Sequence, residues 1–173
     1  LREDKDDPNL LAFCWITDFP FFEKDEKGKY TFTHNPFSAP KPEHLNHLLK
    51  KEGIGEILTS QYDIVLNGFE IGGGSIRNHQ AAPLRAVFEI LGYSTGQIEN
   101  NFGHLLQALA SGAPPHGGIA WGLDRLLAIL AGEPNIREVI AFPKTGEGRD
   151  LMMNAPAPAT ADQLKELKIK VVS

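Results

Sequence analysis

The sequence predicts an α+β fold in which an antiparallel β-sheet is flanked by helices. Two observations favour this class. Apolar runs with strand-like spacing alternate with amphipathic helical segments, but no regular strand–helix–strand rhythm of the kind that builds a parallel sheet runs along the chain. Two of the apolar runs are joined by Asn67-Gly68, the dipeptide typical of a tight β-hairpin, whose two strands are antiparallel.

The composition limits the class of protein and its cellular setting. The 173 residues suffice for one ordinary domain, and 42% hydrophobic with 23% charged residues is a globular composition. A net charge of −5 argues against an electrostatic grip on nucleic acid by this segment alone. The single cysteine, Cys14, excludes an internal disulfide framework and is expected to be buried in its apolar run. We therefore expect a reducing, cytoplasmic compartment and no membrane contact. Because the chain starts without Met, we also expect a piece of a longer protein.

The first half of the chain begins with strands. Residues 11–17 are apolar and aromatic enough for a buried strand, and the short alternation at 30–34 is a candidate for the other arm of a hairpin. Pro42 opens a helix that runs to about Lys51 and is ended by Gly53. Two strands then follow across the Asn67-Gly68 turn.

The second half combines helices with short strands. Amphipathic or apolar segments ended by glycine predict three helices, at 82–92, 101–112 and 123–132. Thr160 with Gln163 makes a capping box for a last helix. Glycine-laced or apolar runs predict strands at 117–122 and 138–144, and a further candidate at 168–172.

The hairpin brings two acids together. If Asn67-Gly68 forms a two-residue type I′ loop, Val65 faces Glu70 across the ladder, and Asp63 lies on the same sheet face as Glu70. Diagonal neighbours of this kind are ~7–8 Å apart at the backbone, close enough to share a cation. Two carboxylates on a rigid sheet suit Mg²⁺, which keeps several waters and takes other ligands from phosphate. The hairpin alone is explained at least as well by a pair of solvated carboxylates.

The glycines that follow make a ligand site more attractive. With simple alternation Gly72 and Gly74 continue the Glu70 face and leave a bare floor for a flat ligand, while Arg77 points to the opposite face. A bulge within Gly72–Gly74 would bring Arg77 to the side of the acids, and glycine suits a bulge. The alternative is a glycine-rich bend with an exposed arginine.

A second glycine-rich strand leads to another arginine. Three of residues 117–122 are glycines, so this strand carries few side chains. It leads into a helix with Arg125 in its first turn, where backbone N–H groups attract anions. Arg125 can grip a phosphate by two hydrogen bonds, and Asp124 can orient it. A surface Asp–Arg pair of little energetic value is the alternative. Together the two segments predict a ligand with a carboxylate and a phosphate, bound over Mg²⁺.

These segments resemble a known family. The run GGIAWGLDR, residues 117–125, is similar to the third signature motif of class II aminoacyl-tRNA synthetases, which would lie at residues 118–125. The stretch YDIVLNGFEIGGGSIRNH resembles the bacterial-type aspartyl branch of that family. Five flanking stretches fit the same branch in the same order: WITDFPFFE, THNPFS, FGHLLQAL, GAPPHGG and IREVIAFPKT. The resemblance covers nearly the whole chain.

The resemblance implies roles for particular residues. Arg125 would hold the γ-phosphate of ATP, and Asp63 with Glu70 would organise Mg²⁺ and ATP. Arg77 would pair with the side-chain carboxylate of aspartate, and His34 would lie on a mobile loop over the amino acid. The remaining nucleotide-binding positions would be Gly122, Leu123 and Asp124. Many relatives carry two histidines where this chain has His34-Asn35, so the second contact of that loop stays open.

The resemblance also implies a function and a domain. The parent would be an aspartate–tRNA ligase, which activates L-aspartate with ATP to an adenylate and transfers it to tRNA, and it would be a homodimer. Residues 1–173 would form the C-terminal half of one class II catalytic domain. The family's first and second motifs, its anticodon-binding domain and its inserted domain are not among these residues, so we expect the isolated chain to be inactive.

Two other functions compete with this one. A non-catalytic, synthetase-like binding or regulatory module would be expected to lose site residues, yet Asp63, Glu70, Arg77 and Arg125 are all present. An asparagine-related relative would bind an amide side chain, which offers no reason for a fully charged guanidinium partner. Arg77 therefore favours aspartate.

Overall fold

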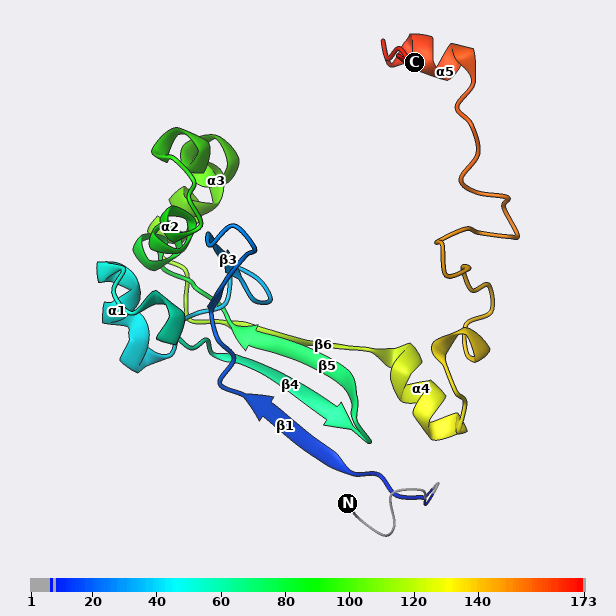
Figure 1. The fold of residues 1–173 in the computed structure, drawn as a ribbon, viewed down its shortest axis with the longest axis horizontal. Coiled ribbons are helices and arrows are strands. Elements are labelled where there is room, and N and C mark those ends of the chain that lie inside the picture. Colours follow the sequence, from blue (N-terminus) through cyan, green and yellow to red (C-terminus); the bar gives the residue numbers. More distant parts are fainter. Residues whose placement is uncertain (1–6, 8, 173) are drawn as a thin grey trace. The chain divides into compact units, whose positions relative to one another are not determined.

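The computed structural model describes residues 7 and 9–172, and the chain divides into two units, Leu1–Leu123 and Asp124–Ser173. The first unit holds a four-stranded sheet in the order β1-β4-β5-β6, in which every neighbouring pair is antiparallel (Figure 1). The strands are β1 (Phe13–Thr17), β4 (Gln61–Leu66), β5 (Phe69–Ile76) and β6 (Gly117–Trp121). The predicted α+β class with an antiparallel sheet and helices is confirmed.

The β4–β5 hairpin has the predicted turn but a different irregularity. Asn67 and Gly68 both have positive φ, 50° and 88°, as a type I′ turn requires. The register then passes from Val65↔Glu70 to Ile64↔Gly72, so the extra residue is Ile71. The prediction of a bulge within Gly72–Gly74 is therefore wrong. The side chain of Ile71 is buried, and its carbonyl accepts a hydrogen bond from Gly122 N at 2.8 Å, which stabilises the residue that the ladder leaves unpaired.

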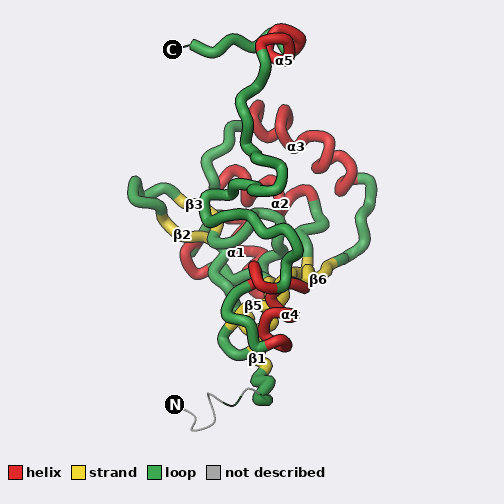
Figure 2. Tube along the Cα trace, turned by 90° about the vertical axis from the view of Figure 1, so that its right-hand side faces the viewer, coloured by secondary structure: helices red, strands yellow, loops and turns green. Residues whose placement is uncertain are grey.

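A second, two-stranded sheet consists of β2 (Phe22–Lys24) and β3 (Tyr30–Phe32) (Figure 2). The pairing of the 30–34 segment with the 11–17 strand is thus wrong. The turn between β2 and β3 is closed locally, because Asp25 Oδ1 accepts from Lys27 N at 2.9 Å and from Lys29 N at 2.8 Å. Strand β2 is only three residues long, too short to show an alternating pattern in the sequence.

Three helices of the first unit gather near the end of the sheet where β5 finishes (Figure 1). They are α1 (Leu45–Lys50), preceded by a 3₁₀ turn at Pro42–His44, α2 (Ala81–Ile90) and α3 (Thr95–Ala110). Helix α3 starts earlier than predicted because Ser94 and Gln97 form a capping box.

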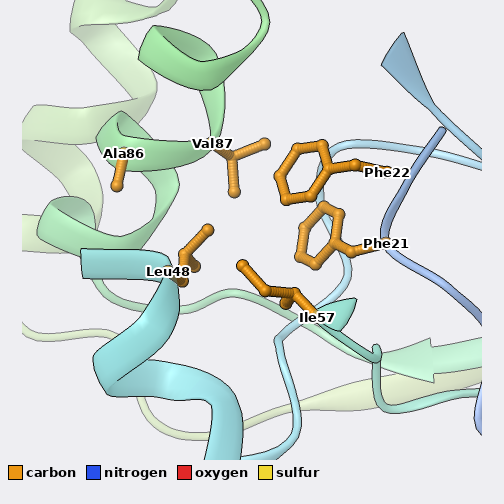
Figure 3. Packing of buried hydrophobic residues seen from close by; sticks show 6 residues of the cluster. All are labelled: Phe21, Phe22, Leu48, Ile57, Ala86 and Val87. Atoms are coloured by element: carbon orange, nitrogen blue, oxygen red, sulfur yellow. The ribbon is translucent and has the colours of Figure 1, made fainter. Parts of the chain in front are cut away.

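One core cluster of the first unit joins α1 and α2 to the loop after β1, and a second one joins α2 to α3 (Figure 3 shows the first). The Phe21 and Phe22 rings stack at 4.5 Å, and side chains from α1, α2 and a neighbouring turn pack on them. Burial of each large apolar side chain stabilises the fold by about 1.5–3 kcal/mol. The remaining members of this cluster are Leu48, Ile57, Ala86 and Val87. The helices of this cluster lie near the end of the sheet that holds the last residues of β5.

Strand β1 departs from expectation in its burial. All five of its residues are exposed, including Cys14, which was expected to be buried. The reason is its position at the edge of the sheet, where it pairs only with β4. Among the described residues, no helix is long and apolar enough to cross a membrane.

The second unit holds α4 (Leu123–Ala131, whose first residue belongs to the first unit), a 3₁₀ turn at Ile136–Glu138, and α5 (Ala161–Glu166). The capping box of Thr160 and Gln163 is confirmed. The strands predicted at 138–144 and 168–172 are wrong. In the first, Asn135 Oδ1 accepts from Arg137 N at 2.9 Å and starts the 3₁₀ turn instead. In the second, Lys168 has a left-handed φ of 53°, which breaks an extended run.

Candidate active site

The two acids of the hairpin share one face of the sheet. Asp63 and Val65 point to the same side of β4 because side chains alternate along a strand. Val65 pairs with Glu70 and Asp63 pairs with Gly73, so Glu70 and Gly73 face that side as well. The predicted juxtaposition of Asp63 and Glu70 is confirmed.

The floor between the acids is Gly73, not the predicted Gly72 and Gly74. A Cβ atom at Gly73 would lie 2.6 Å from Asp63 Oδ1 and 3.2 Å from Glu70 Oε1. At Gly72 it would meet the Ile64 side chain at 3.2 Å, and at Gly74 it would collide with the carbonyl of Gly118. The difference follows from the bulge at Ile71, which shifts the alternation of β5 by one residue. Gly73 leaves room for the carboxylates, whereas Gly72 and Gly74 leave room for packing within the sheet.

Asp63 is an unusual acid electrostatically. It is 9% exposed. Burial raises the pKa of the Asp63 carboxyl above its ordinary value, and the nearby charge of Glu70 raises it further. A hydrogen bond from the Gln61 side chain and the charge of His34 act in the opposite direction on this pKa. Two carboxylates that repel each other at a bare backbone are an arrangement that a bound cation would stabilise.

The chemistry of the donor set fits Mg²⁺ better than a metal held wholly by protein. No group of three or more His, Cys, Asp or Glu side chains that could hold a metal occurs among residues 7 and 9–172. A cation at Asp63 and Glu70 would therefore take most of its ligands from water or from a bound molecule. Mg²⁺ commonly binds proteins in this way, through one or two carboxylates and the phosphates of a substrate.

Arg77 lies on the same face as the acids. Beyond Ile71, the positions that face this side are Gly73, Ser75 and then Arg77. The backbone of Arg77 is held on both sides, because its N–H donates to the His116 carbonyl at 2.8 Å and the residue forms a β-bridge with Ser38. One cavity of about 250 Å³ lies over this face, and its lining includes four of the candidate residues: His34, Asp63, Glu70 and Arg77.

The loop beside the cavity presents His34 and Asn35. The exposed His34 ring packs edge-on against Phe19, with ring centroids 4.7 Å apart. Asn35 Oδ1 accepts from Phe37 N at 2.9 Å and from Arg77 Nη1 at 3.4 Å. The loop is thus tied to the arginine by Asn35, while His34 remains accessible at the rim.

Two further residues of the cavity were missed by sequence reasoning. Gln61 supports Asp63 from two positions earlier on β4, and Ser75, which pairs with Gln61, is fully buried under the same face. Ser75 Oγ has no hydrogen-bond partner in the described part of the chain. The alternation of side chains on either side of Asp63 and Arg77 was the signal that could have identified both residues.

The remaining candidates lie where β6 leads into α4. Gly122 N donates to the Ile71 carbonyl, which anchors the end of β6 to the bulge. Leu123 is the first residue of α4, and Asp124 and Arg125 follow in its first turn. Asp124 and Arg125 belong to the second unit. The strand-to-helix junction predicted from the glycine pattern is confirmed.

Comparison with known sequences gives the same family as the motifs of this chain. The family of tRNA synthetases class II (D, K and N) matches residues 3–146. The chain is 54% identical over 166 residues to an aspartate–tRNA(Asp/Asn) ligase of Phenylobacterium zucineum (strain HLK1), covering 95% of this chain and 28% of that protein. It is 53% identical to the protein of the same name from Chlorobaculum parvum (strain DSM 263 / NCIMB 8327), covering 95% of this chain and 27% of that protein. The chain therefore spans about a quarter of the length of these relatives.

Solved structures show the same fold. An aspartyl tRNA synthetase from Entamoeba histolytica superposes with a TM-score of 0.57 at 21% identity, over 78% of this chain and 23% of that one. An asparaginyl-tRNA synthetase from the same organism, in complex with asparaginyl-adenylate, superposes with a TM-score of 0.58 at 24% identity, over 80% of this chain and 26% of that one.

Proposed function

The chain belongs to the family of class II tRNA synthetases (D, K and N), and from this premise we propose that it is part of an aspartate–tRNA ligase. The full-length enzyme activates L-aspartate with ATP and then transfers the aspartyl group to tRNA. Residues 1–173 form the C-terminal half of its catalytic domain in this proposal. The names of the relatives and the charges around the cavity support it.

One observation carries the choice of substrate. Arg77 lines a cavity whose floor is the bare Gly73, and its guanidinium contacts the neutral amide of Asn35, with 3.4 Å between Nη1 and Oδ1. A planar guanidinium binds a carboxylate by two parallel hydrogen bonds. A volume of about 250 Å³ suits an amino acid, since it is below the ~300–1,000 Å³ typical of larger ligands. Arg77 therefore binds the side-chain carboxylate of aspartate.

The other residues serve the nucleotide. In the first step the α-carboxylate of aspartate attacks the α-phosphorus of ATP and pyrophosphate leaves, so catalysis consists mainly of positioning and of stabilising negative charge. Asp63 and Glu70 would hold Mg²⁺, which neutralises phosphate charge when it is bound. Arg125 holds the γ-phosphate at the start of α4, and the nucleotide also contacts Gly122, Leu123 and Asp124. His34 lies over the bound amino acid.

The second substrate and the cellular setting complete the proposal. A hydroxyl group of tRNA attacks the carbonyl of the adenylate, and AMP leaves. The relatives are named for both tRNA(Asp) and tRNA(Asn), which favours a parent that charges both tRNAs with aspartate. Family membership further supports a homodimeric, cytoplasmic enzyme. Aminoacylation of the two purified tRNAs distinguishes a dual from a single specificity.

Pyrophosphate exchange by the full-length protein tests the activation step. We expect exchange that depends on aspartate and is at least about a hundredfold weaker with asparagine, because an amide leaves the arginine without its counter-charge. Exchange that is equal or faster with asparagine would replace this function by that of the asparagine-related relative. No exchange with either amino acid would favour a non-catalytic module.

A further inference from the structure

Asn35 makes an unusual set of contacts beside the cavity. Its Oδ1 accepts from Phe37 N at 2.9 Å, from Ser38 N at 3.1 Å and from Ser38 Oγ at 3.3 Å, and it also contacts Arg77 Nη1 at 3.4 Å. The two backbone donors fix which end of the amide is the oxygen, because an N–H group needs an acceptor. The oxygen of Asn35 is thus oriented by its own turn before it meets Arg77.

The segments that carry Asn35 and Arg77 are locked together by backbone pairing. Ser38 and Arg77 form a β-bridge. Asn78 N donates to the Phe37 carbonyl and Ala39 N to the Ile76 carbonyl, both at 2.8 Å. Side chains held on paired segments keep a defined separation, which is the condition for a preorganised contact.

The chemistry of the contact leaves the arginine available. The amide of Asn35 is neutral, so it orients the guanidinium without cancelling its charge. A carboxylate at the same place would form a charge-assisted pair with Arg77 and compete with an incoming ligand. The 3.4 Å between Arg77 Nη1 and Asn35 Oδ1 is long for a hydrogen bond, so a carboxylate that binds Arg77 more closely can replace this contact.

We propose that Asn35 is a positioning residue, which holds the guanidinium of Arg77 with a neutral acceptor so that this charge is aimed and uncompensated when the substrate carboxylate arrives. This inference rests on the proposed function, in which Arg77 recognises aspartate. Asn35, the loop residue next to His34, would then contribute to the selectivity for aspartate over asparagine.

Replacing the amide by an acid separates this role from a structural one. Asn35→Asp keeps oxygen acceptors for Phe37 N and Ser38 N, so the turn is retained, but it places a negative charge beside Arg77. In the full-length enzyme we expect the KM for aspartate to rise about tenfold to a hundredfold, the loss that corresponds to one charge-assisted hydrogen bond. The KM for ATP should stay within about threefold, since Arg125 and the acid pair are unchanged.

The ratio of kcat/KM for aspartate over asparagine is the second readout. This ratio should fall in Asn35→Asp, because the charge of Arg77 is already neutralised, and a purely structural role would leave it unchanged. Asn101→Asp, which adds the same charge at an exposed position of α3, should behave as the wild type. Asn35→Ala should also raise the aspartate KM and lower the ratio, so it keeps the test decisive if Asn35→Asp fails to fold.

Failure of this inference differs from failure of the function. A wild-type enzyme without aspartate-dependent exchange would overturn the proposed function. A wild-type enzyme that is active, with the aspartate KM and the ratio of every folded Asn35 variant within about twofold of the Asn101→Asp control, would overturn only the role of Asn35.

Discussion

The carboxylates of Asp63 and Glu70 converge on the bare backbone of Gly73, where a methyl group would lie 2.6 Å from Asp63 Oδ1 and 3.2 Å from Glu70 Oε1. The hairpin puts both acids on one face, and the bulge at Ile71 adds Gly73 and Arg77 to that face. A side chain at Gly73 would occupy the space that the proposed cation and nucleotide need.

Gly73→Ala is therefore expected to damage activity more than folding. Because Gly73 does not have a left-handed φ, alanine is allowed by the backbone, and the clash is with two side-chain oxygens that can move. Displacing both acids should lower aspartate-dependent pyrophosphate exchange by about a hundredfold, as small misplacements of catalytic groups do. Exchange kinetics and thermal melting of the full-length enzyme check the two halves of this prediction.

Two other glycines serve as comparisons. A methyl group added at Gly96 in α3 would meet no atom within 4 Å, so Gly96→Ala should keep activity and gain about 0.5–1 kcal/mol of stability. Gly74→Ala should instead prevent correct pairing of β5 with β6, because its Cβ would collide with the backbone of Gly118. Full activity of Gly73→Ala would show that the space between the acids is not used.

The second prediction concerns the pH dependence of stability. The pKa of Asp63 is raised in the folded state by burial and by Glu70, so the folded protein binds this proton more tightly than the unfolded chain. The ionised carboxylate therefore costs stability above its folded pKa, and this cost disappears as the pH falls towards the ordinary value of 3.8. Without divalent cations, Asp63→Asn should melt at a higher temperature than the wild type at pH 7, and the difference should shrink on acidification.

The effect of Mg²⁺ on the melting temperature is the control for this prediction. Mg²⁺ that binds the acid pair should raise the melting temperature of the wild type at pH 7, whereas the variant, which has lost one ligand, should respond less. Lower stability of Asp63→Asn at pH 7, or an equal response of both proteins to Mg²⁺, would contradict this account of the pair.

Local signals in the sequence were enough for several elements. The Asn67-Gly68 turn, the capping box of Thr160 with Gln163, and the β6–α4 junction each depend on a few adjacent residues, and each was predicted. The strand expected at 138–144 failed because the cap at Asn135 and the following 3₁₀ turn override the apolar pattern. The partner of β3 was missed because β2 is too short to show a period.

The candidate site was predictable as a set of residues but not in its detailed geometry. Alternation in β4 and β5 placed Asp63 with Glu70, and only a bulge could add Arg77. The position of that bulge depends on the contact between Ile71 and Gly122, which is distant in sequence. For the same reason the floor residue Gly73 followed only from the structure, as did the contact of Asn35 with Arg77.

A third prediction concerns the nucleotide. In the full-length enzyme, Arg125→Ala should raise the KM for ATP or lower kcat by about a hundredfold, as loss of a charged donor to a phosphate does, and should leave the KM for aspartate nearly unchanged. The 173-residue chain alone should show no exchange. Arg85→Ala, which removes a surface ion pair with Glu99, is the matched control and should be active. A larger effect on aspartate than on ATP would assign Arg125 to the other substrate.

The most direct measurement compares Arg77→Leu with the wild type in aspartate-dependent pyrophosphate exchange by the full-length enzyme. Loss of the half-buried counter-charge should cost about 3–5 kcal/mol, so kcat/KM for aspartate should fall at least about a hundredfold while the KM for ATP stays within about threefold. Arg77→Lys should also be poor, because a lysine cannot make two parallel hydrogen bonds. A value of kcat/KM for aspartate within about threefold of the wild type in folded Arg77→Leu would contradict the account.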